Sequence, residues 1–203
     1  MSFTPEVLSY EDIRREAESF LDEYGGNNEI PVGIEQIVEF DFDMEVIPVD
    51  GLCDDLRVDA FLSNDLTAIF VDQHIMQFVE VRYRFSLAHE LGHYWLHDGL
   101  YQSTEVQSVK DFRRVQESLG DNYKWFEFQA NSFAGLVLVP SPSLKARFTR
   151  RVAEAREGGV SESALLKHPL RQRLIEGMAR DFNVSEQTMG IRLEKDALLP
   201  PLV

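Results

Sequence analysis

The spacing of apolar residues along the chain predicts a mostly helical protein. Apolar positions recur every three or four residues in Tyr10–Tyr24 and Gly33–Phe40, as they do on the buried face of a helix. The sequence Gly25-Gly26-Asn27-Asn28 separates these two segments and is typical of a turn. A longer helix is expected at Val81–His97, which contains no proline and a single glycine. In the connection that follows, from 98 to 124, Val109–Leu119 is the most helical part.

Three short apolar runs between the second and third of these helices predict strands. The turn-forming pairs Asp50-Gly51 and Asn64-Asp65 divide the runs from one another. A small sheet is therefore expected directly before the long helix. Its expected strands are Met44–Pro48, Val58–Leu62 and Ala68–Val71.

Beyond Pro140 the composition changes and basic residues become frequent. Ser143–Glu157 is predicted to form a basic helix that ends at a pair of glycines. Two more helices are expected at Arg173–Asp181 and Glu186–Leu193, with Ser185 as the N-cap of the second, and together they resemble a helix-turn-helix. The second helix offers few side chains for reading DNA, namely Glu186, Gln187, Thr188 and Arg192. We therefore expect these helices to pack on the rest of the chain or to dock a partner.

Two histidines in the long predicted helix bracket a glutamate in the H-E-x-x-H pattern of zinc peptidases. His89 and His93 are four residues apart, so on a helix both imidazoles point from the same face and can bind one ion. Glu90 would lie beside that ion, where its carboxylate can take a proton from a water that the ion activates. These residue types at this spacing predict hydrolysis of a peptide bond.

A catalytic zinc ion usually has three protein ligands, so the motif needs one more. His97 follows on the same helix. If that helix is straight, however, His97 lies about 12 Å along the axis from His89, and the two cannot reach one ion. Glu127 is the better candidate, because it is the only ionisable residue from Trp125 to Pro140. A lone carboxylate in such an apolar segment is expected to be paired or to bind a metal if it is buried.

Small and polar residues follow Glu127 at helical spacing. Ala130 and Ala134 would form a smooth face that lets this helix approach the histidine helix closely. Asn131 lies one turn after Glu127 and is placed to hydrogen-bond a metal ligand. Peptide hydrolysis also needs a donor for the developing oxyanion, and the sequence offers five candidates. They are Tyr83, Tyr94, His97, Tyr101 and Tyr123.

The two candidate metal motifs resemble those of the ImmA/IrrE family of metallo-endopeptidases. The likeness lies in Arg84–Tyr94, in the pattern Glu127-x-x-Ala130-Asn131-x-Phe133-Ala134, and in Leu136–Pro140 after it. By this resemblance His89, His93 and Glu127 are metal ligands and Glu90 is the general base. Members of the family that are understood cleave a helix-turn-helix repressor, which relieves repression of mobile-element or stress-response genes. The resemblance therefore implies such a repressor as the substrate.

The resemblance also implies a fold and a domain organisation. We expect a zincin-like α+β fold, mostly helical, with a small mixed sheet before the active-site helix and a helix-turn-helix-like segment at the C-terminal end. The metallopeptidase core would occupy 1–140, and the C-terminal helical segment, 141–203, would pack on it. In zincin-like folds an edge strand of such a sheet can align an extended peptide through backbone hydrogen bonds.

Composition and charge narrow the classes of partner. The 203 residues carry a net charge of −15, and residues 1–80 hold 20 acidic against 3 basic side chains. Direct binding to nucleic acid is therefore not expected. The sequence has neither a signal peptide nor a stretch that approaches a membrane span, which predicts a cytoplasmic protein. The single cysteine, Cys53, rules out an internal disulfide and is expected to be a plain loop or core residue rather than a metal ligand.

The sequence thus predicts a zinc-dependent metallo-endopeptidase whose protein substrate is a helix-turn-helix repressor. Two histidines and one carboxylate also suit Mn²⁺ or another divalent metal. The alternative is a non-proteolytic regulatory adaptor that keeps the metal site and binds a repressor or DNA through its C-terminal helices. Glu90 favours the peptidase, because an adaptor does not need a general base.

Overall fold

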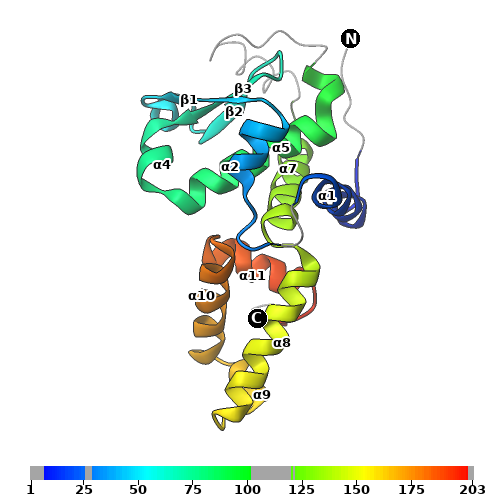
Figure 1. Ribbon diagram of the computed structural model, residues 1–203, viewed down its shortest axis with the longest axis vertical. Helices are drawn as coiled ribbons and strands as arrows, with labels where there is room; N and C mark the ends of the chain where they lie inside the picture. The colour runs from blue at the N-terminus through cyan, green and yellow to red at the C-terminus, as the bar shows by residue number, and fades with distance from the viewer. Residues whose placement is uncertain (1–6, 26–28, 102–119, 121, 201–203) are drawn as a thin grey trace.

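The computed structural model describes residues 7–25, 29–101, 120 and 122–200. Figure 1 shows an elongated molecule with the sheet towards one end, the helices α8, α9 and α10 towards the other, and α7 between them. The expected α+β fold is confirmed, since helices predominate and the described strands form one small mixed sheet. Within the described residues, no helix has both the length and the apolar character that crossing a membrane requires.

The first helices agree with the sequence prediction. Helix α1 spans Tyr10–Tyr24, and Ser9 caps it by accepting a hydrogen bond from the backbone N–H of Asp12. Helix α2 (Ile34–Gln36) continues into a π-helical turn (Ile37–Asp41), and together they cover the predicted helix at Gly33–Phe40. The segment before α2 is tied to the long helix α5, because the buried guanidinium of Arg84 donates to the backbone oxygen of Val32.

The sheet has the strand order β1-β3-β2. Strand β1 (Glu45–Val49) runs parallel to β3 (Ala68–Asp72), and β2 (Ala60–Leu62) runs antiparallel to it. All three strands lie where the sequence predicted them, within two residues at each end. Strand β2 is one edge of the sheet, and it packs against α5.

The connection from β1 to β2 differs from the prediction. It contains a short helix, α3 (Leu52–Leu56), where the sequence indicated only a turn at Asp50-Gly51. Gly51 has a positive φ of 72°, a conformation that glycine adopts without strain, and this residue sets the start of α3. Five residues are too few for a helical period to be recognised in the sequence.

Helix α4 (Gln73–Phe78) leads into α5 (Glu80–Tyr101), which contains the predicted helix Val81–His97. Helix α5 is not straight throughout, because His97 has φ −134° and ψ 21°, outside helical geometry. The predicted helical part of the next connection, Val109–Leu119, lies outside the described residues. The next helix that the structure describes is α7 (Asn122–Leu138).

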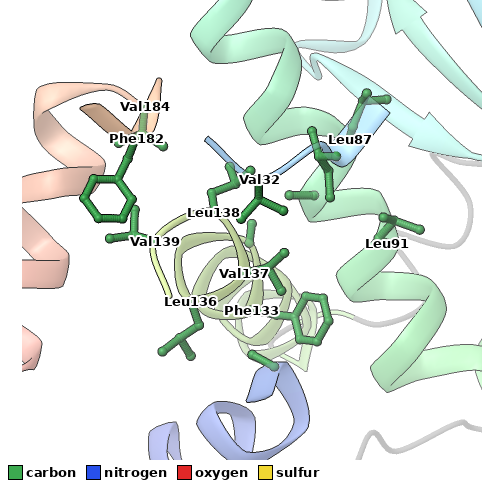
Figure 2. Packing of buried hydrophobic residues seen from close by; sticks show 14 of the residues in the cluster. Val32, Leu87, Leu91, Phe133, Leu136, Val137, Leu138, Val139, Phe182 and Val184 are labelled. Carbon is green, nitrogen blue, oxygen red and sulfur yellow. The ribbon is translucent and has the colours of Figure 1, made fainter. Parts of the chain in front are cut away.

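Helices α5 and α7 approach each other closely at Gly92. A Cβ atom added there would lie 3.2 Å from the Cα and the backbone oxygen of Ala130 and 3.2 Å from the ring of Phe133. Ala130 and Ala134 are completely buried, in agreement with the smooth face expected of α7. Figure 2 shows Leu87 and Leu91 of α5 on the side that faces α7. Small residues at the crossing therefore set the distance between the two helices.

Three C-terminal helices follow the prediction. They are α8 (Ser141–Glu157), α10 (Leu170–Phe182) and α11 (Glu186–Lys195). The short helix α9 (Glu162–Leu165) was not predicted. Ser185 is the N-cap of α11, as expected, because its hydroxyl accepts from the backbone N–H of Thr188. The boundary between a core and a C-terminal segment at residue 140 stays a prediction.

A buried arginine joins α11 to the rest of the molecule. Arg192 is 2% exposed, and its guanidinium donates to the hydroxyl of Tyr10 at 2.7 Å and to the hydroxyl of Ser141 at 3.0 Å. It also donates to the backbone oxygen of Val139 and pairs with Asp196 at 3.3 Å. One side chain thus links α11 to α1 and to the junction of α7 and α8. Arg192 is therefore engaged in packing and is not displayed for reading DNA.

Replacing Gly92 by valine tests the crossing of α5 and α7. We expect the free energy of unfolding to fall by about 2 kcal/mol, because backbone atoms of Ala130 have to move away from the new side chain. The control is Gly190→Ala in α11, where an added Cβ meets no atom within 4 Å. That substitution should stabilise the protein by about 0.5–1 kcal/mol. Urea unfolding followed by circular dichroism measures both, and a stabilising Gly92→Val would contradict the close approach.

Candidate metal centre

Three side chains from the two crossing helices converge on one point. His89 and His93 come from α5 and Glu127 from α7, and their candidate ligand atoms all lie within 4.8 Å of one another. The two Nε2 atoms are 3.0 Å apart, and the carboxylate oxygens of Glu127 lie 3.4 Å from His89 Nε2 and 3.5 Å from His93 Nε2. Ligands bound to zinc at about 2.0–2.2 Å in a tetrahedron are about 3.3–3.6 Å apart. The three groups therefore fit a divalent ion of this kind.

The charge states of these groups depend on their burial and on one another. Burial lowers the pKa of His93 to about 4, so its imidazole is neutral at ordinary pH. Burial alone would raise the pKa of Glu127, but the adjacent side chains of His89 and His93 hold that pKa below its usual range. The site therefore offers a carboxylate together with a neutral imidazole, which are the forms that bind metals.

Glu90 lies next to the cluster and is buried. Burial raises the pKa of its carboxyl group to about 7, against the opposing influence of His89 and of a hydrogen bond from the backbone N–H of Leu62. Leu62 is the last residue of the edge strand β2. The edge of the sheet thus holds the Glu90 carboxyl group beside the cluster, with a pKa at which it can both take up and release a proton.

His97 is buried behind His93 and is not among the converging groups. Its Nδ1 lies 3.1 Å from Nδ1 of His93, and its Nε2 lies 2.9 Å from Oε1 of Gln129. Burial lowers the pKa of His97 to about 3, which keeps this imidazole neutral. His97 thus contacts the candidate ligand His93, and its place outside the cluster agrees with the expectation that His97 and His89 do not reach one ion.

Two other residues lie as the sequence indicated. Asn131 is within hydrogen-bonding reach of the His89 side chain, as expected from its place one turn after Glu127. Cys53 is on α3, where its Sγ lies 3.6 Å from a carboxylate oxygen of Asp59 and its backbone N–H donates to Asp72. Burial raises the pKa of the thiol to about 11, so Cys53 is protonated and unreactive.

The tyrosines proposed as oxyanion donors have other surroundings. The charges of Glu35 and Glu39 lie close enough to Tyr83 to act on its hydroxyl group. The ring of Tyr94 packs against that of Phe42, with 5.0 Å between the ring centres. Both therefore face the segment around α2. Tyr123 packs against the main hydrophobic core, His97 is engaged with His93 and Gln129, and the side chain of Tyr101 lies outside the described residues.

Sequence reasoning missed two groups at this site. Gln129 lies on α7, and its role becomes clear only when His97, 32 residues earlier, is placed beside it. The N–H of Leu62 is a backbone group and leaves no mark in the sequence. The one signal in the sequence was the position of Gln129, a polar side chain two residues after the candidate ligand Glu127.

Comparisons with family models and with solved structures both gave matches. The model of peptidase family M78, described as the IrrE N-terminal-like domain, matches residues 77–194, which include both candidate metal motifs and extend into α11. A solved structure of a Mycobacterium tuberculosis transcriptional regulator is similar, with a TM-score of 0.56 and 18% sequence identity. The similarity covers 91% of this chain and 46% of that one, so this chain spans somewhat less than half the length of the regulator. A search of curated proteins found no significant match.

The likeness to the regulator shows a shared fold. The family model shows family membership as well, because it matches more than half of the chain and includes both the histidine helix α5 and α7. The resemblance of the two motifs to the ImmA/IrrE peptidases is thereby confirmed, and the chain belongs to the M78 family of metallopeptidases, which has the IrrE N-terminal-like domain.

Proposed function

We propose that this chain is a zinc-dependent endopeptidase in which His89, His93 and Glu127 hold the metal and Glu90 is the general base. The observation that carries the proposal is the set of distances among the three candidate ligands, 3.0, 3.4 and 3.5 Å. The two distances to Glu127 match the spacing of ligands around tetrahedral zinc, and the 3.0 Å between the two Nε2 atoms is somewhat shorter than that spacing. Manganese or another divalent metal is compatible with the same donors.

Each residue of the proposed centre has a separate task. When bound, the ion would supply Lewis acidity to the reaction. Glu90 accepts a proton from the attacking water and passes it to the leaving amine, a transfer that its pKa of about 7 permits in both directions. The N–H of Leu62 orients the Glu90 carboxyl group. Because β2 is an edge strand, an extended peptide aligned along it would pass directly beside Glu90.

The contacts among His93, His97 and Gln129 determine which ring nitrogen of His93 has a lone pair for binding a metal. The side-chain oxygen of Gln129 only accepts, so His97 donates from Nε2. Neutral His97 then has a lone pair on Nδ1 and accepts from the Nδ1–H of His93. His93 consequently presents the lone pair of Nε2 to the metal position. Gln129 therefore positions the His93 ligand through His97, as groups behind metal ligands commonly do.

We further propose that the substrate is a helix-turn-helix repressor in the cytoplasm. Membership of the IrrE-like family supports this choice, because the family resemblance implies a repressor as substrate. The regulator of similar fold adds only that related folds occur in a transcriptional regulator. The buried Arg192 agrees with a partner other than DNA for the C-terminal helices.

Replacing Glu127 by alanine tests the third ligand. We expect protein purified without added metal to carry near-stoichiometric zinc and the variant to carry at least about tenfold less, because two imidazoles alone bind zinc poorly. Elemental mass spectrometry gives the metal content per chain. The control is Glu157→Ala at the exposed end of α8, which should retain the wild-type content. Zinc retained in Glu127→Ala would overturn this ligand assignment.

Replacing Glu90 by glutamine tests the general base. The variant should keep its zinc and lose about 10²- to 10⁴-fold in cleavage, because glutamine cannot accept the proton. Cells expressing either protein are compared by labelling new protein N-termini and identifying them by mass spectrometry. New N-termini within a repressor should arise only with the wild type. An adaptor would instead leave both sets identical while its effect on transcription persisted.

Replacing Gln129 by methionine tests the positioning of His93. Methionine fills similar space without the acceptor, so zinc affinity should fall about 10- to 100-fold. Competition with a chromophoric chelator measures the affinity, and ¹⁵N chemical shifts of labelled histidine should show that His93 loses its Nδ1–H form. Gln172→Met on α10, where the amide donates to Glu186, is the matched control. Equal affinities in the two variants would refute the role of Gln129.

A further inference from the structure

A groove of about 700 Å³ lies beside the proposed metal centre, between the N-terminal part of α5, the middle of α7 and one face of α11. Large apolar side chains from all three regions line it. Phe128 of α7 is 38% exposed and Ile191 of α11 is 50% exposed, although both are large and apolar. The remaining apolar lining consists of Val79, Val81 and Phe85.

The groove begins one helical turn from the proposed ligands on both helices. Phe85 precedes His89 by four residues on α5, and Asn131 follows Glu127 by four residues on α7, so each lies on the same helical face as its ligand. Asn131 also connects the two regions directly, because it lines the groove and hydrogen-bonds His89. The groove is therefore continuous with the centre where the scissile bond would lie.

Helix α11 closes the far end of the groove. The Cδ atom of Arg192 lies 3.5 Å from the position of a Cβ at Gly135, two turns after Glu127 on α7. From His89 back to Val81 is also about two turns, or about 12 Å. An extended chain advances about 3.3 Å per residue, so three or four residues span the distance from the proposed ligands to the far end of the groove.

Charge contributes little to the lining. Arg82 is paired with Asp59, Arg192 is paired with Asp196, and the Lys195 ammonium lies 4.9 Å from the centre of the Tyr10 ring. The other polar lining groups are uncharged and suit a peptide backbone, and they are Asn131, Ser132, Ser185, Gln187 and Thr188. The groove thus offers apolar contacts to side chains and hydrogen bonds to backbone.

We propose that this groove binds three or four residues of the extended polypeptide substrate on one side of the scissile bond, and that it selects a large aliphatic or aromatic side chain. The inference rests on the proposed endopeptidase function. It gives α11 a defined role, because the second helix of the helix-turn-helix-like segment forms a wall of the substrate groove. Ile191 is then a specificity-determining residue that lies far in sequence from the metal motifs.

Peptide hydroxamates test this inference without knowledge of the natural substrate. Acetohydroxamate reports on the metal alone, and two series of longer hydroxamates extend from the metal in either direction with Leu, Phe or Asp at successive positions. Isothermal titration calorimetry with the zinc-loaded protein gives each Kd relative to that of acetohydroxamate. In one series we expect the Leu and Phe compounds to bind about 10- to 100-fold more tightly than the Asp compound, as burial of such a side chain predicts.

Variants then assign this preference to the groove. Ile191→Asp and Phe128→Asp should each reduce the ratio of Leu to Asp affinities at least about tenfold. Both side chains are partly exposed, so neither substitution removes a buried core residue. The matched control is Phe40→Asp, which alters a 76% exposed phenylalanine that does not line the groove and should leave the ratio unchanged.

The outcomes separate the inference from the function on which it rests. If acetohydroxamate does not bind the zinc-loaded protein, the proposed peptidase centre is wrong and the groove inference falls with it. If acetohydroxamate binds but neither series prefers Leu or Phe, the centre stands and the groove inference is overturned. A preference that survives in Ile191→Asp and Phe128→Asp, or that disappears equally in Phe40→Asp, also overturns it.

Discussion

The structure depends on the close crossing of α5 and α7. In the proposed centre two histidines on one helix would supply two ligands, and the third would come from a helix near enough for a glutamate to reach both. Gly92 and Ala130 allow this approach, because an added Cβ at Gly92 would lie 3.2 Å from backbone atoms of Ala130. The carboxylate of Glu127 thereby reaches within 3.5 Å of each imidazole. A wider separation would take the Glu127 carboxylate out of reach of the two imidazoles, so helix packing and the proposed metal centre share one constraint.

Around this crossing, buried polar groups are placed in pairs, which follows from the cost of leaving such groups without hydrogen bonds. His97 bonds to Gln129 and to His93, and the N–H of Leu62 bonds to Glu90. These contacts satisfy the polar groups and at the same time hold them in one orientation. A side chain that is locked by its neighbours needs no reorganisation when an ion or a substrate arrives, which is the usual advantage of a preorganised site.

The sequence was informative where one local pattern determined the outcome. The helical period located α1, α5 and α11, and the spacing of His89 and His93 required a helix to bring them together. Glu127 stood out because it is a lone carboxylate in an apolar segment. Pairs that form across the fold left no such pattern. Gln129 becomes meaningful only beside His97, the bond from Leu62 to Glu90 uses a backbone group, and α3 is too short to show a period.

The C-terminal helices also change meaning once their packing is known. In sequence, α10 and α11 resemble a helix-turn-helix, and Arg192 lies where a DNA-reading side chain would be sought. In the structure Arg192 is buried and joins Tyr10, Ser141 and Asp196, so α11 is fixed against α1 and the junction of α7 and α8. The family match continues to residue 194 and therefore includes Arg192 and Ser141 of this contact. We infer that α11 serves the same site as the metal centre, because a helix fixed by a buried arginine keeps Ile191 at a constant distance from the reacting bond.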